Sequence, residues 1–432
     1  MLKRIFYLYS IALPIAVQSL IVSSKSFVDT YLLTLSSFES VSAVGIASKI
    51  FLVAFIILSG ISTGASYVMS HNSESVKCIS YSSKFTLRFG CGAAILIIIL
   101  VYYIKDYILL FSSGNKSILS LSSSYIDIVL PSLIFISVTL TLSSLIRIKG
   151  DYRTPSVISI VSVFINITLS FVLIYNFKLG VIGAAYGTVI SSLIECLIIL
   201  YISYRRFFDL FRMKCYKPGL MSRICKQAFF SSSSGIVWAV GASAFYILLG
   251  SRDQEVLYIM SIISPIEAVV LSFTIGLSVS TGIEIGKDIP NRSNDYIFED
   301  AKISIISSFL MSFLISMLLL MSKDLIFKSF GFNQLIIDAD MFFYIMTFSI
   351  FIKSLSIQLM NGVIRAGGDG LFCLRCDFIF QWLFTLPLVL YLNSISMSVV
   401  YIYSIVVIEE LLKLILCIFR FNSGKWLQNL AA

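Results

Sequence analysis

Residues 147–151 read RIKGD and residues 365–369 read RAGGD, so the pattern Arg-x-x-Gly-Asp occurs twice, 218 residues apart. That offset is about half of the 432-residue chain and predicts two similar halves. We expect the two copies to form equivalent turns, because Gly150 and Gly368 permit tight backbone geometry. Asp151 and Asp369 are expected to accept hydrogen bonds from neighbouring backbone or from arginine, which makes their role structural.

The composition around these turns is that of an integral membrane protein. Hydrophobic residues make up 58% of the chain and charged residues 13%, whereas soluble domains carry about 25% charged residues. The first apolar run, from about residue 7 to residue 35, is too long for the core of a signal peptide and lacks a small-residue cleavage site. We therefore interpret it as the first membrane span and expect the mature chain to start at Met1.

The polar and charged breaks divide the chain into apolar runs that are long enough to cross a bilayer of about 30 Å. They predict an all-α polytopic membrane protein with twelve transmembrane helices in two pseudo-symmetric six-helix bundles. The predicted parts are an N-terminal lobe (1–204), a basic cytoplasmic linker (205–225) and a C-terminal lobe (226–432). The predicted spans are centred in 7–35, 42–70, 86–104, 119–146, 154–175, 181–204, 226–249, 256–286, 301–321, 335–364, 376–392 and 396–418.

The distribution of basic residues predicts the orientation of the chain. With the amino terminus placed in the cytoplasm, the inside segments hold 22 lysines and arginines and the outside segments hold six. Such an excess predicts that both termini are cytoplasmic, in a multi-pass protein of the bacterial inner membrane. The net charge of +9 then reflects topology and contact with anionic membrane lipid, and no nucleic-acid partner is expected.

Cysteine and histidine give no sign of a metal site. The eight cysteines are scattered without a pairing pattern and are expected to be free thiols. The close pair CLRC at 373–376 lacks a second pair or a histidine at zinc spacing. We expect no metal and no cofactor apart from a coupling ion, H⁺ or Na⁺.

Several stretches resemble the multidrug and toxic compound extrusion (MATE) family, part of the multidrug/oligosaccharidyl-lipid/polysaccharide superfamily. The resemblance covers nearly the whole chain and is most specific in the amino-terminal half. It rests on LPIAVQSL (13–20), FVDT (27–30), AVGIASKI (43–50), SGISTGAS (59–66), GDYRTP (150–155), NITLSFVLIY (166–175), GVIGAAYGTVIS (180–191), RAGGDG (365–370) and WLFTLPL (382–388).

This resemblance implies a secondary active antiporter. It would export a small organic solute in exchange for protons or sodium, by alternating access around a cavity between two six-helix lobes. The resemblance does not fix the charge of the solute, and we expect a monomer. The alternative is the sister branch of the superfamily, which flips lipid-linked oligosaccharides and shares the glycine and asparagine pattern of helices five and six.

Asp29 is the strongest candidate for the residue that binds the coupling ion. A charge at the bilayer centre costs about 2.5–3.5 kcal/mol on insertion scales, so an intramembrane acid is a functional candidate by default. Asp29 lies about 9 Å inside the outer end of the first span, and Ser170 and Thr188 lie at a similar depth. The resemblance implies that the aspartate in the VDT position, with Asn166 and Thr188, lines a cavity and binds the ion. A polar cluster that only joins helices is the alternative.

The chain departs from the family pattern in its other acids. Many members carry a second acid four residues after the asparagine, where this chain has Ser170. The stretches that match helices seven and ten contain no acid, and the second of them carries Lys353 instead. We therefore expect Asp29 to be the main carboxylate that couples ion binding to transport, with Glu195 and Glu267 as reserve candidates.

Two lysines accompany Asp29. Lys25 lies four residues earlier on the same helix face, and Lys49 enters from the second span at a comparable depth. Either lysine can serve as a counter-ion that Asp29 exchanges for a proton or solute, or as a static partner. Together with Lys353, these lysines also suggest an alternative, in which the cavity accepts an anionic or zwitterionic solute.

A membrane-embedded enzyme is the third hypothesis, from a different functional class. Membrane acyltransferases generally need an intramembrane histidine as a base. The one histidine, His71, lies in the polar loop SHNSES, and no Gly-x-Ser-x-Gly elbow is present. The sequence therefore predicts a transporter and no enzyme.

Overall fold

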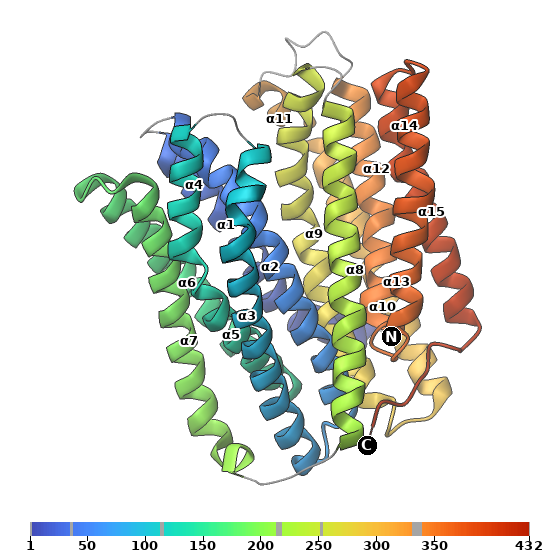
Figure 1. Ribbon diagram of the computed structural model, residues 1–432. Helices are drawn as coiled ribbons and strands as arrows, with labels where there is room; N and C mark the ends of the chain where they lie inside the picture. The colour runs from blue at the N-terminus through green and yellow to red at the C-terminus, as the bar shows by residue number, and fades with distance from the viewer. Residues whose placement is uncertain are drawn as a thin grey trace. The chain divides into compact units, whose positions relative to one another are not determined.

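The computed structural model describes residues 2–34, 38–112, 116–212, 218–250, 254–330 and 339–431. These residues form helices and no strand, which confirms the all-α prediction (Figure 1). The helices are α1 (Leu2–Thr34), α2 (Phe38–His71), α3 (Val76–Ser112), α4 (Lys116–Val129), α5 (Ser132–Ile148), α6 (Arg153–Phe171), η1 (Val172–Asn176), α7 (Gly180–Arg212), α8 (Pro218–Gly250), α9 (Gln254–Asp288), α10 (Asn294–Met321), α11 (Lys323–Phe330), α12 (Ala339–Ile357), η3 (Gln358–Ile364), α13 (Gly370–Phe378), η4 (Ile379–Thr385), α14 (Leu386–Ser394) and α15 (Val399–Asn422).

Every predicted span overlaps one of these helical segments. Within the described residues, ten helices are long and apolar enough to cross a membrane, or eleven if the bent pair α4 and α5 counts as one span. That pair is bent by 46° where Pro131 follows α4, because proline cannot donate a backbone hydrogen bond. Helix α15 is long enough to cross a membrane, but it is not among these helices because Glu409, Glu410 and Lys413 place charges within its apolar run.

The chain folds as two compact units, whose boundaries fall inside α1 and α8. Unit 1 contains residues 1–20 and 233–430, and unit 2 contains residues 21–232 and the last two residues. Helix α7 continues to Arg212 and α8 begins at Pro218, so both helices extend into the stretch expected to be a linker. The proposed lobe limits of 1–204 and 226–432 stay a prediction.

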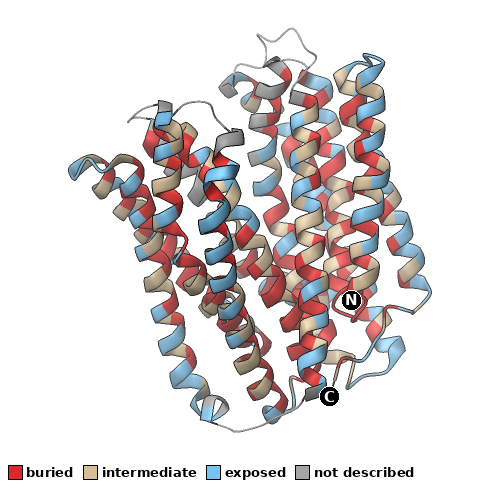
Figure 2. Ribbon diagram, viewed as in Figure 1, coloured by how far each residue is buried: buried red, intermediate tan, exposed pale blue. Residues whose placement is uncertain are grey.

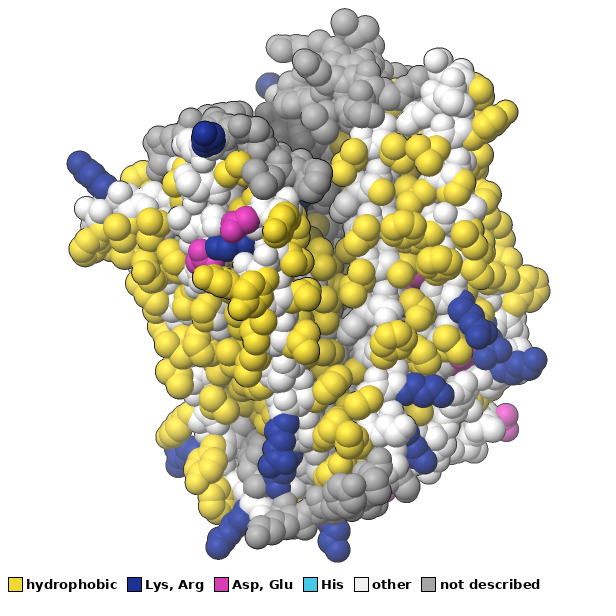
Figure 3. Space-filling view, in the orientation of Figure 1, with side chains coloured by type: hydrophobic (Ala, Val, Ile, Leu, Met, Phe, Trp, Pro, Cys, Tyr) yellow, Lys and Arg dark blue, Asp and Glu magenta, His cyan; other side chains and the backbone are white. Residues whose placement is uncertain are grey.

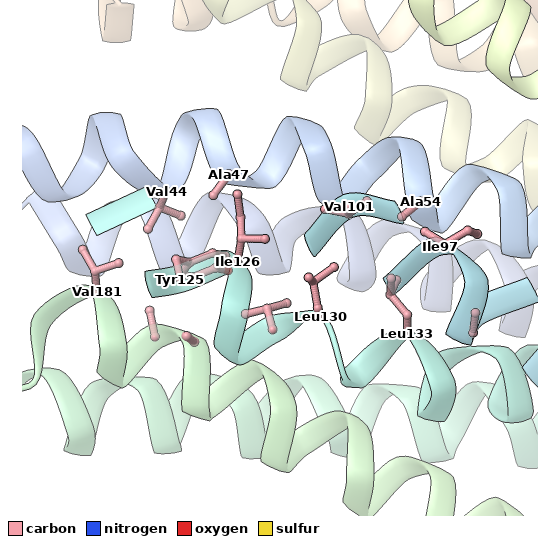
Figure 4. Close-up of a cluster of buried hydrophobic side chains, with 14 of the residues drawn as sticks. Val44, Ala47, Ala54, Ile97, Val101, Tyr125, Ile126, Leu130, Leu133 and Val181 are labelled. Atoms are coloured by element: carbon pink, nitrogen blue, oxygen red, sulfur yellow. The ribbon is translucent and has the colours of Figure 1, made fainter. Parts of the chain in front are cut away.

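Unit 2 is built around a core of small and branched side chains from α2 to α7. Ala47, Ala54 and Leu133 are almost completely buried, and Figure 4 shows Ile126, from α4, among them. Buried and exposed residues alternate along the visible helices (Figure 2), and apolar side chains cover much of the face seen in Figure 3. Exposed apolar side chains in such numbers fit contact with lipid.

Unit 1 has a core of its own, and the first half of α1 belongs to the same unit. Phe342, Phe343 and Leu249 are buried in this core. An added Cβ on Gly276 of α9 would lie 2.6 Å from the Ala16 backbone nitrogen, so glycine lets α1 pack directly on α9. The Arg4 guanidinium donates two hydrogen bonds to the Asp300 carboxylate, at 2.6 and 2.8 Å. These bonds hold the first turn of α1 against α10.

The first half of α8 is held in unit 2 in the same manner. An added Cβ on Gly60 of α2 would lie 2.4 Å from the Cα atom of Ser232, and the Ser232 hydroxyl donates to the carbonyl oxygen of Ile57 at 2.9 Å. Gly60 and Gly276 are 216 residues apart, as are Ala16 and Ser232. The internal repeat therefore extends from the loops to the helix contacts.

The two Arg-x-x-Gly-Asp turns are equivalent, as predicted. Gly150 has φ +93° and Gly368 has φ +98°. In each turn the glycine N–H donates to the carbonyl oxygen three residues back, at 2.9 and 3.0 Å, and the aspartate N–H donates to the carbonyl five residues back, at 3.2 Å. This is the Schellman arrangement that ends a helix on a left-handed glycine.

Both aspartates accept hydrogen bonds from arginine, which also confirms the prediction. Asp369 accepts from Arg420 Nε at 2.6 Å, and Asp151 accepts from Arg206 and from the Thr154 amide at 2.9 Å. Burial raises the pKa of Asp151, but hydrogen bonds from Thr154 and Arg206 outweigh it, so this pKa lies below its usual value. The carboxylate is therefore ionised and structural at neutral pH.

Alanine at these two glycines should destabilise the protein unequally. A non-glycine residue in a left-handed conformation costs about 1–2 kcal/mol, and nothing lies near an added Cβ at Gly150. An added Cβ at Gly368 would also meet Gln428 and Leu430 at 3.1 to 3.2 Å. We expect Gly368→Ala to lower the free energy of unfolding in detergent more than Gly150→Ala; an equal loss would contradict the added contact.

Candidate functional site

Three of the predicted site residues lie together between α6 and α7 in unit 2. Asn166 and Ser170 are fully buried, and Thr188 is 7% exposed. The Asn166 amide nitrogen lies 3.5 Å from both the Ser170 and the Thr188 hydroxyl oxygens, which is long for a hydrogen bond. Gly187 makes room for Ser170, whose hydroxyl would lie 2.4 Å from an added Cβ. The loosely bonded cluster is compatible with a binding role.

Glu195 lies two turns further along α7. Its carboxylate accepts a hydrogen bond from the Ser159 hydroxyl of α6 at 2.6 Å. Glu195 therefore helps to join these two helices, and its role as a reserve coupling acid stays a prediction.

The remaining predicted residues of this half are Asp29, Lys25 and Lys49. Asp29 and Lys25 belong to α1, but their side chains lie outside the described residues. Lys49 is exposed on α2. The pairing of Asp29 with a lysine stays a prediction.

In unit 1, Lys353 of α12 meets Glu267 of α9. The Lys353 ammonium lies 2.5 Å from a Glu267 carboxylate oxygen, and both side chains are mostly buried, at 12% and 14% exposure. The Tyr246 hydroxyl donates to the other Glu267 oxygen at 3.2 Å. The Lys353 ammonium also lies 5.5 Å from the centre of the Trp238 ring. The predicted cavity lysine and a reserve acid thus form one buried ion pair.

A second charged cluster is centred on Lys413 of α15. Its ammonium lies 2.6 Å from Glu409, 3.8 Å from Glu410 and 3.9 Å from Asp377 of α13. The Thr385 hydroxyl donates to the second Glu409 oxygen at 2.7 Å. Glu409 is thus well satisfied, whereas Glu410 is beyond hydrogen-bond distance of Lys413.

The repeated turn joins this cluster through its arginine. Arg365 donates to the Ser234 hydroxyl at 2.7 Å and lies 3.9 Å from Asp377, to which Ser234 in turn donates. Among the described residues, the Lys353–Glu267 pair and the Lys413 cluster together hold four carboxylates and three cations. The carboxylates are Glu267, Asp377, Glu409 and Glu410, and the cations are Lys353, Arg365 and Lys413. One carboxylate is therefore in surplus, and Glu410 has the weakest compensation.

A cavity of about 50 Å³ opens on these charges. This volume suits a few water molecules or one ion and is well below the 300–1,000 Å³ of pockets for drug-sized ligands. The lining includes Trp238, Tyr246, Glu267, Lys353, Glu409 and Glu410.

Sequence reasoning missed Asp377, Glu409, Glu410 and Lys413. The signal was present in the stretch EELLK, which places three charges within five residues inside an apolar helix. On a helix, Glu409 and Lys413 share one face at a spacing of four residues, which predicts their pairing.

Comparisons with known proteins give a consistent picture. The family model MatE matches residues 14–172 and 235–392, which is more than half of the chain and one stretch in each half. The chain is 22% identical to the "Probable multidrug resistance protein NorM" of Thermotoga maritima, over 97% of this chain and 92% of that protein. It is 28% identical to the "Multidrug export protein MepA" of Staphylococcus aureus, over 34% of this chain and 33% of that protein.

Solved structures share the fold. A structure described as the outward-facing conformation of a multidrug resistance MATE family transporter matches with a TM-score of 0.87 and 14% identity, over 98% of this chain and 96% of that one. A superfamily transporter from Pyrococcus furiosus matches with a TM-score of 0.83 and 14% identity, over 98% and 96%. This likeness confirms the predicted twelve-helix, two-lobed fold class. The chain therefore belongs to the MATE family of secondary transporters.

Proposed function

We propose that this transporter exports a small organic solute in exchange for protons or sodium, by alternating access. The observation that supports it most is the surplus carboxylate of unit 1, where Glu410 lines a cavity of ion or water size. A buried carboxylate without a full partner is stabilised by binding a proton or a metal cation. The name of the relative from Staphylococcus aureus, a multidrug export protein, supports export as the direction of transport.

The coupling ion acts through a difference in binding free energy. An ion shifts the balance between two conformations only by as much as its affinities for them differ. Glu410 is our candidate for such a group in unit 1. Asp29, in the VDT stretch, stays the candidate in unit 2, with Asn166 and Thr188 as its neighbours in the family pattern.

The experiment is solute flux in proteoliposomes of the purified protein. A panel of cationic, anionic and zwitterionic solutes is tested by counterflow, and then a pH gradient and a sodium gradient are imposed in turn. We expect accumulation of one solute class driven by one of the gradients. Gradient-independent movement of a lipid-linked oligosaccharide alone would replace the proposal with the flippase alternative.

The orientation belongs to the same proposal: a monomer in the bacterial inner membrane with both termini in the cytoplasm. It is supported by the excess of basic residues on one side of the predicted spans. A cysteine placed at Lys217, between α7 and α8, should resist a membrane-impermeant thiol reagent in intact cells. The same cysteine should react after the membrane is opened; reaction before that step would reverse the orientation.

A further inference from the structure

We infer that Lys353 is a tethered cation that fills a binding site for an organic ammonium ion in unit 1, and that it thereby determines which solutes the cavity accepts. The inference rests on the proposed export function for its biological meaning. Its physical content, the occupancy of the site, can be measured without transport.

The surroundings of the Lys353 ammonium are those that recognise an alkylammonium ligand. The Glu267 carboxylate lies 2.5 Å away and supplies the opposite charge. The Trp238 ring lies 5.5 Å from the ammonium, within the range of a cation–π interaction. The Tyr246 hydroxyl holds the second Glu267 oxygen at 3.2 Å and so fixes the carboxylate toward the lysine.

The site continues into the cavity and is not closed around the lysine. Lys353, Glu267 and Trp238 line that cavity, together with Phe245, Tyr403 and Met346. Trp238 lines the cavity beside Glu267, so both the ring and the carboxylate border the same space. Shortening Lys353 would add the volume of its side chain to the space beside Glu267 and Trp238.

A tethered group competes strongly with a free ligand. The effective concentration of a group on a short linker is in the millimolar range or higher. A free organic cation must displace the Lys353 ammonium and leave it unpaired in a buried place, which is unfavourable. The wild-type site is therefore expected to reject simple monocations. A solute with its own carboxylate can pair with Lys353.

The test is equilibrium binding of radiolabelled tetramethylammonium to purified protein in detergent. Lys353→Ala should bind this cation at least tenfold more tightly than wild type, because Glu267 is left without its partner. Lys353→Arg, which keeps the charge, should bind as weakly as wild type. Lys353→Ala combined with Glu267→Gln should lose the gain. If Lys353→Ala is unstable, tetramethylammonium should raise its melting temperature and leave that of the double variant unchanged.

Lys105 provides a matched control in unit 2. Its ammonium pairs with Asp127 and lies 5.2 Å from the Tyr102 ring, so it makes the same kinds of contact. It does not line the cavity, and Lys105→Ala should not gain cation binding.

The outcomes separate this inference from the proposed function, because the binding assay uses no gradient. Absence of both a binding gain and a thermal shift in Lys353→Ala would overturn the inference, even if export is coupled to an ion. A gain that survives Glu267→Gln would also overturn it. A Glu267-dependent gain in a protein that exports nothing would support the inference and refute the export proposal.

Discussion

The Lys413→Met variant is expected to lose about 3–5 kcal/mol of folding free energy, because it leaves buried carboxylates without their shared cation. Lys413 is only 3% exposed and lies within 4 Å of Glu409, Glu410 and Asp377. Removing one partner of a buried pair is far more costly than removing both, since the remaining charge stays desolvated. Thermal and denaturant unfolding in detergent measures the loss.

One combined variant and one variant of an exposed lysine serve as controls for this prediction. Glu409→Gln and Glu410→Gln, added to Lys413→Met, should restore a large part of the stability because the unpaired charges are removed together. Lys77→Met, at an exposed position of α3, should change stability by about 0.5 kcal/mol or less. A Lys413→Met protein as stable as wild type would contradict this prediction.

The Glu410→Gln variant is expected to lose gradient-driven export by about 5- to 150-fold, the range of typical coupling free energies. Glutamine keeps the size of the side chain but cannot exchange a proton or hold a cation by charge. Glu410 lies 3.8 Å from Lys413, beyond hydrogen-bond distance, and its replacement removes the surplus charge. Stability should therefore be unchanged or higher, while counterflow without a gradient persists.

Asp29→Asn, measured at matched expression, decides between the two candidate coupling sites. If Glu410→Gln keeps wild-type coupling and Asp29→Asn loses it, the coupling group belongs to α1. If both variants lose coupling, the transporter uses a carboxylate in each unit. Wild-type coupling in both would remove these acids from the mechanism and leave Glu195 and Glu267 to be tested.

The apolar runs and the repeated turns of the sequence predicted the fold. The site was predicted less completely, because its charged residues meet through contacts between helices. Apolar runs predicted every span because a membrane helix must be apolar along most of its length. The repeated turns were predictable because Gly150 and Gly368 adopt a positive φ angle, which other residues adopt only at a cost. The pairing of Lys353 with Glu267 was not predictable, because it depends on how α9 packs against α12.

Other features could not be read from the sequence for a similar reason. The bend at Pro131 depends on where α4 ends, and the apolar run there continues across it. The clustering of Arg365, Asp377 and Lys413 joins residues from three separated segments. Charge spacing within α15 can indicate the contact between Glu409 and Lys413, although this contact was not among the predictions from the sequence.

The division of α1 between the two units has a consequence for the order of events during synthesis. Residues 21–232 are a nearly complete unit once α8 has started to emerge, whereas Arg4 finds Asp300 only when α10 has been made. At about 5–20 residues per second, the first turns of the chain wait on the order of tens of seconds for their partners. During that interval the apolar start of α1 depends on lipid or on the insertion machinery for cover. A ribosome that stalls between α8 and α10 would therefore leave a folded unit with an undocked amino terminus, a distinct target for quality-control proteases.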